Sequence, residues 1–387
     1  MDRISIEAIN RFSTRWADLS PPTVSTVFSA ACAWPLLALL SAAASGSVRV
    51  ELQDALGVPT TAAHHLSVDV LAGLADLPGV AAALGLWARD DLPLRPQWIE
   101  SLPPGVLDRL SGNAAADKKR LDAWASEKTS GLIGAMPVEV KPATVLVLAT
   151  ALALRTQWVR PFTDVPTRAG AGPWARLGTL AGLKRSTGNL DDVAVLDTPG
   201  GPITRLRLEG NNGIDVYLLV GEPERPASGI LAGGTSSTGI EGSQLPLGFN
   251  APGLTVEETR AADSRPQLAV RTVRFTVRAD HDLLASPLFG LRAASQPPRS
   301  PGHHFPGISA DMLLVDQARQ DAMATFSSTG LEAAAVTAVA MTRAGFVRPD
   351  KTRKTVRVTL DRPFGFYATH RETGLILVAG WVAEPEL

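Results

Sequence analysis

Residues 145–162 read VLVLATALALRTQWVRPF, an apolar run that leads into Trp158 and then Pro161 and Phe162. Residues 144–154 (TVLVLATALAL) are continuously apolar and begin with β-branched side chains. A short run of this kind predicts a strand buried on both faces at the centre of a sheet, and a buried helix is the alternative. The fold class therefore depends on the segments that surround it.

Helical patterns dominate the chain before this run. Residues 4–19 place Ile6, Ile9, Phe12 and Trp16 at spacings of three and four, which is typical of a helix that buries one face. The apolar run 27–44 predicts a strand and then a buried helix. It is preceded by 26 residues that include acidic ones, unlike the short basic start of a secretory leader. Residues 50–56 and 106–136 predict two further helices.

Alternating patterns dominate the chain after residue 200. They predict strands, at residues 203–208, 214–218, 267–278, 356–360 and 375–379. In the third of these the alternation changes phase at Thr272 and Val273, which predicts a bulge or a boundary. No repeat of fixed period and no long linker divides the chain. We therefore predict a single domain, residues 1–387, of the α+β class.

The composition and charge exclude several classes of protein. The 37 basic and 38 acidic residues nearly cancel, so no overall field attracts nucleic acid or a membrane. The single cysteine, Cys32, excludes an internal disulfide, and the histidine pairs at 64–65 and 303–304 point to opposite faces if extended. No GxSxG, SxxK, HExxH or P-loop motif is present. We predict no enzyme, cofactor or metal site, and we slightly favour a cytoplasmic over an extracellular location.

Residues 332–341 (EAAAVTAVAM) have divided preferences, because alanine favours helix while valine and threonine favour strand. One interpretation is a surface helix. The other is a strand that can enter a sheet, since its small side chains need little room. In a strand, Leu331, Ala333, Ala335 and Thr337 share one face and residues 332, 334, 336 and 338 share the other. A register slip by one residue would bury the carboxylate of Glu332.

Four segments, in this order, resemble the serpin family of serine protease inhibitors. They are residues 121–137 (LDAWASEKTSGLIGAMP), 145–162, 330–339 (GLEAAAVTAV) and 360–385 (LDRPFGFYATHRETGLILVAGWVAEP). The resemblance implies a serpin fold with about eight or nine helices, three β-sheets and an exposed reactive-centre loop at about residues 330–355. It also implies a metastable monomer.

The resemblance implies a suicide inhibitor of a serine protease, which cuts the loop and is trapped when the freed arm inserts into the central sheet. The hinge of that arm would be Gly330, Leu331, Glu332, Ala333, Ala334, Ala335, Val336 and Thr337. The bait bond would lie near Ala344–Gly345. Arg343, one position earlier, suits a trypsin-like protease, and Ala344 suits one with a small pocket. The resemblance places Trp158, Thr150 and Gln320 where the sheet opens.

Several positions differ from the inhibitory pattern. Leu331 replaces a hydroxyl residue, Ser328 replaces a glutamate, and Thr150 and Gln320 replace an asparagine and a histidine. A Ser–Pro pair after the first strand is lost near Ala30 and Ala31, and Gly365 replaces a large apolar residue. These changes favour an alternative, a non-inhibitory serpin that acts as a binding, carrier or substrate protein. Residues 348–354 (RPDKTRK) indicate a solvated loop or a docking patch for an acidic surface.

Overall fold

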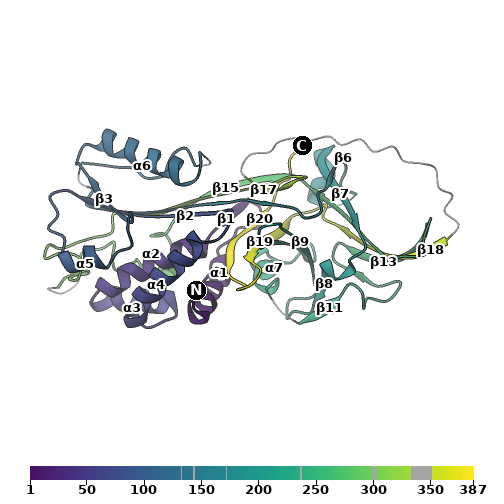
Figure 1. The fold of residues 1–387 in the computed structure, drawn as a ribbon, viewed down its shortest axis with the longest axis horizontal. Helices are drawn as coiled ribbons and strands as arrows, with labels where there is room; N and C mark the ends of the chain where they lie inside the picture. The colour runs from purple at the N-terminus through teal and green to yellow at the C-terminus, as the bar shows by residue number, and fades with distance from the viewer. Residues whose placement is uncertain (132, 143, 171, 236–237, 299–301, 333–350) are drawn as a thin grey trace.

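The computed structural model describes residues 1–387 except 132, 143, 171, 236–237, 299–301 and 333–350. The described chain holds seven α-helices and three β-sheets in an elongated arrangement (Figure 1). The predicted α+β class is confirmed, and these helices number fewer than the eight or nine expected. They are α1 (Arg3–Ala17), α2 (Ala30–Ala43), α3 (Gly46–Leu56), α4 (Thr60–Ala75), α5 (Pro96–Ser101), α6 (Ala114–Lys128) and α7 (Ala227–Gly233). Short 3-10 helices are η1 (Pro173–Leu177), η2 (Leu190–Asp192) and η3 (Pro287–Phe289).

The first two helices form as their sequences predict. Helix α1 buries Ile6, Ile9, Phe12 and Trp16 on one face. Helix α2 follows the short strand β1 (Thr26–Phe28) and is buried along nearly its whole length, which explains its almost uniformly apolar sequence. No helix in the described ranges is both long and apolar enough to cross a membrane.

The long sheet contains most of the apolar run of residues 144–154. Its strands, in spatial order, are β3 (Leu107–Leu110), β2 (Val80–Arg89), β4 (Leu146–Leu154), β16 (Gln317–Phe326), β17 (Gly330–Glu332) and β5 (Thr156–Gln157), and β15 (Phe275–Asp282) pairs with β16. Figure 1 shows α2, α3 and α4 on one side of this sheet and α6 on the other.

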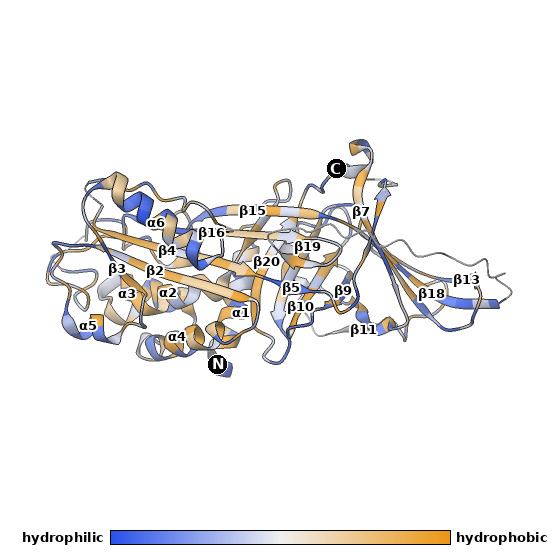
Figure 2. Cartoon of the chain, turned by 45° about the horizontal axis from the view of Figure 1, so that its top comes forward, coloured by the Kyte–Doolittle hydropathy of each residue, from blue (hydrophilic) through white to orange (hydrophobic). Residues whose placement is uncertain are grey.

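Strand β4 is covered on both faces, as predicted. Leu146, Leu148 and Leu152 join the main core on the side of α2, and Val147 and Ala149 join a second core with α6. The strand is hydrophobic along its length, as is its neighbour β2 (Figure 2). A continuous apolar run thus marks a strand between two layers of helix rather than a helix.

Two further sheets complete the fold. The inner sheet has the order β1, β20 (Ile376–Val382), β19 (Phe364–His370), β10 (Ile214–Val220), β9 (Ile203–Glu209), β8 (Val193–Leu196) and β11 (Gly239–Glu241). The outer sheet has the order β12 (Asn250–Ala251), β13 (Leu254–Ala261), β18 (Lys351–Thr359), β14 (Gln267–Val273), β7 (Leu180–Thr187) and β6 (Thr163–Thr167).

Three sequence expectations are refined by these strands. The phase change at Thr272 and Val273 is a boundary, because β14 ends at Val273 in the outer sheet and β15 starts at Phe275 in the long sheet. The helix expected over residues 106–136 was wrong at its start. There β3 forms, and Gly112, at φ 83°, separates it from α6. Both described ends of the expected loop, at 330–332 and from 351 onward, are strands.

The one cysteine provides a test of the packing of α2. Cys32 is 2% exposed, and burial raises the pKa of its thiol to about 12. Because the thiolate is the reactive form, we expect a thiol reagent at pH 8 to modify the native protein at least about a hundredfold more slowly than the urea-unfolded chain. Equal rates in the two states, followed by absorbance of the released reporter, would contradict this packing.

Candidate functional site

The chain makes a tight hairpin where the predicted hinge begins. Strand β16 ends at Phe326, and β17 returns antiparallel with Phe326 opposite Leu331 and Thr325 opposite Glu332. The turn is closed by Ser327, whose backbone N–H donates to the Gly330 carbonyl (2.9 Å) and whose Oγ accepts from the Gly330 N–H (3.3 Å). The first residues of the hinge are therefore already part of the long sheet.

Strand β17 occupies a slot between β16 and β5. Its second edge pairs antiparallel with β5, with Gly330 opposite Gln157 and Leu331 opposite Thr156. A Cβ atom at Gly330 would overlap the Thr156 carbonyl oxygen, so the two backbones can approach this closely only at a glycine. Leu331 is 1% exposed and belongs to the main core, which shows that its side chain faces inward.

The slot between β16 and the β4–β5 segment closes a few residues further into the sheet. There β4 and β16 are direct parallel neighbours, from Val147 opposite Gln317 to Leu152 opposite Ala322. The chain of β4 continues through Arg155 into β5. The strand that pairs with β16 and the strand that pairs with β17 therefore belong to a single segment. The seam between β4 and β16 is the line along which a longer inserted strand would have to separate the sheet.

Thr150 and Gln320 lie opposite each other across this seam. The Gln320 Nε2 donates to Thr150 Oγ1 (3.2 Å) and to the Ser29 carbonyl (2.9 Å), and the Ser29 N–H donates to Gln320 Oε1 (2.7 Å). All three residues are at most 1% exposed. Separating the two strands would leave buried polar groups without partners, which costs about 1–3 kcal/mol for each group.

Ser29 is the member of this cluster that the sequence interpretation missed. It stands directly after β1 as the N-cap of α2, and its Oγ accepts from the Cys32 N–H and donates to the Leu377 carbonyl (2.7 Å). A serine thus stands directly after the first strand, and the residue that follows it is Ala30 and not a proline. A serine directly before a helical apolar run is an N-cap signal that could have located it.

Trp158 lies away from the seam between β4 and β16, against the hairpin turn between β16 and β17. Its backbone N–H donates to the Thr329 carbonyl (2.9 Å) and its Nε1 donates to the Ser327 carbonyl (3.0 Å). The Phe162 N–H donates to the carbonyl of Ser328, which is itself 4% exposed. The three residues assigned to sheet opening thus fall into two groups, Trp158 at the turn and Thr150 with Gln320 at the seam.

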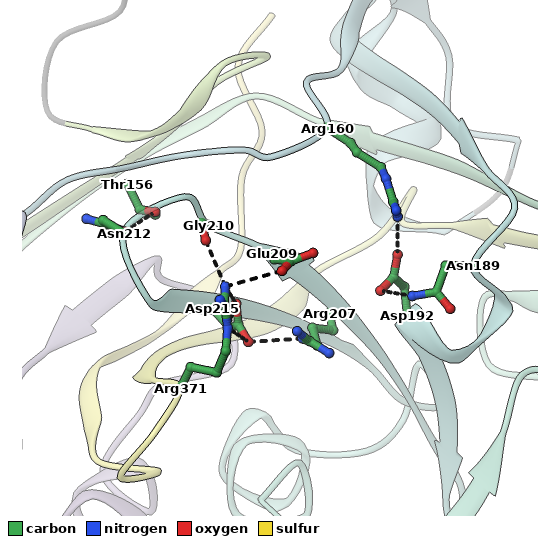
Figure 3. Close-up of polar contacts among 10 residues, drawn as sticks. All are labelled: Thr156, Arg160, Asn189, Asp192, Arg207, Glu209, Gly210, Asn212, Asp215 and Arg371. Atoms are coloured by element: carbon green, nitrogen blue, oxygen red, sulfur yellow. Dashed lines mark hydrogen bonds and ion pairs between the residues drawn. The ribbon is translucent and has the colours of Figure 1, made fainter.

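The wall formed by β5 is fixed to the inner sheet by a polar network (Figure 3). Thr156 Oγ1 donates to Asn212 Oδ1 (2.7 Å), and Asn212 Nδ2 donates back to the Arg155 carbonyl (2.8 Å). Arg371 Nη2 donates to the Gly210 carbonyl (2.7 Å) and to buried Asp215 (2.7 Å). The carboxylate raises the pKa of the Arg371 guanidinium, so this anchor stays charged.

A second ionic contact holds the segment that follows Trp158. Arg160 lies 3.5 Å from Asp192, which also accepts from Asn189 Nδ2 (2.8 Å), and Arg185 Nη1 donates to the Arg160 carbonyl (2.9 Å) (Figure 3). Burial raises the pKa of Asp192 although Arg185 and Arg160 lower it. No sequence motif signals the contacts of Arg160, because its partners Asp192 and Arg185 are 32 and 25 positions away along the chain.

The remaining assigned residues lie outside the described part of the chain. These are the rest of the hinge, Ala333, Ala334, Ala335, Val336 and Thr337, and the bait residues Arg343, Ala344 and Gly345. Their roles stay predictions from the sequence. The described ends of this segment are Glu332 in the long sheet and Lys351 in the outer sheet.

The hairpin of β16 and β17 begins a new strand in a mixed sheet, and the chain after β17 leads to β18 in a different sheet. This arrangement is the one expected of the serpin class. A family model described as "Serpin (serine protease inhibitor)" matches residues 7–171 and 300–385. The chain belongs to the serpin family.

Curated relatives and solved structures agree with this assignment. The chain is 27% identical over 368 residues to putative serpin-Z12 of Oryza sativa subsp. japonica, covering 90% of this chain and 82% of the relative. It is 23% identical to putative serpin-Z6C of the same plant, covering 99% and 96%. A thyroxine-binding globulin in complex with thyroxine (TM-score 0.70, 19% identity, 99% of each chain) shares the fold. So does native protease nexin-1 with heparin (TM-score 0.68, 17% identity, 98% and 97% covered).

The close contact at Gly330 gives a direct test of the slot. We expect Gly330→Ala to lower the free energy of unfolding by about 1–3 kcal/mol, because the added methyl group must displace the backbone of β5 or β17. Gly134→Ala is the matched control, since a Cβ there meets nothing within 4 Å. Urea denaturation of both variants measures the difference. Equal midpoints would show that β17 does not pack against β5.

Proposed function

We propose that the protein is a suicide inhibitor of a serine protease, which cuts the segment after β17 and is trapped when the freed arm enters the long sheet. The observation that supports this most strongly is β17 itself. Leu331 pairs with both β16 and β5, Glu332 pairs with β16 and Gly330 pairs with β5, so an arm released by cleavage would extend an existing strand. No separate nucleation of the new strand is then needed.

The direction of Leu331 specifies which side chains the arm would bury. Leu331 faces the core, so continued alternation turns Ala333, Ala335 and Thr337 inward as well. All three are small, and packed interiors accept added volume only when it is small. Leu331 replaces a hydroxyl residue of the inhibitory pattern, but in this position it adds apolar burial rather than a desolvated polar group.

The energy of insertion is large enough to carry out mechanical work. Roughly ten new ladder hydrogen bonds, at about 1 kcal/mol net each, would release on the order of 10 kcal/mol. Opposing terms are the bonds of Gln320 across the seam and the parallel pairing of β4 with β16. The new strand would replace that pairing on both of its edges, so the backbone groups of β4 and β16 would keep partners.

The test of the proposal uses two arginine substitutions that differ only in the face they occupy. After incubation with trypsin-like and elastase-like proteases, we expect the unmodified protein to form a complex that survives denaturing gel electrophoresis. Ala335→Arg would place a charge inside the sheet and should abolish the complex while the loop is still cut. Ala334→Arg, on the opposite face, should retain it.

Mass spectrometry of the cleaved loop locates the bait bond in the same samples. We expect cleavage after Arg343 with trypsin-like proteases and after Ala344 with elastase-like ones. Absence of a denaturant-resistant complex across the panel, with the loop cut cleanly, would overturn inhibition and favour a substrate or carrier role.

A second candidate function, carriage of a small molecule, is supported by a cavity of about 500 Å³ between α1 and the inner sheet. Tyr217 and Tyr367 are stacked there with ring centroids 4.8 Å apart, and the Arg205 guanidinium lies 5.5 Å from the Tyr217 ring. Aromatic faces and cations suit an anionic aromatic ligand. Saturable binding of anilinonaphthalene sulfonate that Tyr217→Ala weakens at least about tenfold would support this role. An unchanged affinity would contradict it.

A further inference from the structure

The outer sheet carries a groove of about 430 Å³ whose lining is strongly basic. Six of its thirteen lining residues are cationic and none is anionic. The cationic ones are Lys184, Arg185, Arg260, Arg271, Arg353 and Arg357. The whole chain has a net charge of −1, so this concentration of positive charge is local and is not a result of composition.

The strand register holds these cations close together. Lys184 of β7 is directly opposite Arg271 of β14, and Arg357 of β18 is opposite Ala269 on the other edge of β14. Like charges at directly opposite positions destabilise a sheet, and a bound anion would offset that repulsion. The groove lies in the part of the molecule remote from α2 to α4, near β7, β13 and β18 in Figure 1.

Few carboxylates offset this charge. Glu257 binds Arg357 (2.5 Å), Asp192 acts on Arg185 through its field, and Asp263 acts on Arg353 in the same way. Four of the six cations have no ion-pair partner within the described ranges, and these are Lys184, Arg260, Arg271 and Arg353.

Arg185 lies opposite Val270 in the register, on the other face of β7 from Lys184, and adds positive charge behind the groove. It is only 8% exposed, its guanidinium lies 4.7 Å from the centroid of the Phe162 ring, and its Nε has no hydrogen-bond partner among the described residues. Burial lowers its pKa to about 10, which is still far above neutrality, so the buried group stays charged. Its Nη1 donates to the Arg160 carbonyl (2.9 Å) and the Asp192 carboxylate lies near enough to act on it, so of its buried nitrogens only the Nε lacks a hydrogen-bond partner within the described ranges.

The chemistry of the lining narrows the ligand. Guanidinium groups bind phosphate through paired N–H donors, and the hydroxyls of Thr163, Ser186, Thr259 and Thr355 offer further donors. A volume of this size is in the range of small-molecule sites. A single anion would neutralise only one or two of the cations, whereas a compact molecule with several phosphate groups would neutralise most of them. We propose that this groove binds a compact polyphosphorylated ligand.

The test is calorimetric titration of the full chain with inorganic tripolyphosphate, and separately with orthophosphate at the same total phosphorus. We expect tripolyphosphate to bind one to one and at least about tenfold more tightly than orthophosphate. Lys184→Glu combined with Arg271→Glu should weaken that binding at least about tenfold. Lys119→Glu is the control for charge reversal, because Lys119 is exposed on α6, far from the groove, and should change the affinity less than about twofold.

A footprint on the unmodified protein keeps the test valid if the double variant does not fold. Tripolyphosphate should protect Lys184 from amine acetylation and leave Lys119 reactive, as read by mass spectrometry. No saturable binding, equal affinity for the two phosphates, or equal protection of the two lysines would each overturn the proposal. Neither measurement needs a protease or a cleaved loop, so the result is independent of inhibition.

Discussion

The structure depends on a fork between two strands of the long sheet. β4 and β16 are paired neighbours as far as Leu152 and Ala322, and beyond that point the chains diverge to admit β17. Backbone N–H and C=O groups inside a sheet must have partners, so the edges of β5 and β16 beyond the fork require a third strand. Gly330, Leu331 and Glu332 supply it, and only a glycine fits opposite Gln157, where β17 and β5 approach closely.

The two sides of the fork are held differently. The β5 side is tied to the inner sheet through Asn212 and through Arg371 with Asp215, and Trp158 holds the hairpin turn itself. The seam beyond the fork is held by strand pairing and by the bonds of Gln320. A strand that extends β17 would therefore start between β5 and β16, where the structure is firmly held. It would extend toward the seam between β4 and β16, where few side-chain bonds oppose it. This difference favours separation of β4 from β16 over loss of the contacts that hold β5 and the hairpin turn.

Local patterns predicted the parts of the fold in which one residue type repeats with a clear period. The apolar run of β4, the buried face of α1 and the phase change at Thr272 all became the predicted features, because burial alone determines them. The start of the helix expected from residue 106 failed, since four residues of β3 are too few for their alternation to stand out against a helical pattern.

The site was predicted only in part. The hinge position, Thr150 and Gln320 came from a family resemblance, and the structure brings the last two together across the seam. Ser29 had a local signal, its place before an apolar helix, that was overlooked. The anchor at Asn212 and the basic groove had none, because they join residues separated by tens to more than a hundred positions in the chain. Such contacts are determined by topology and not by local pattern.

The central claim is that the long sheet gains a strand when the segment after β17 is cut. The most direct measurement is the thermal unfolding midpoint before and after limited proteolysis within residues 333–350. An insertion free energy on the order of 10 kcal/mol predicts that the midpoint rises by about 12 °C, since the unfolding entropy of a 387-residue chain is about 0.8 kcal/mol/K. A midpoint that stays unchanged or falls after complete cleavage would contradict the account.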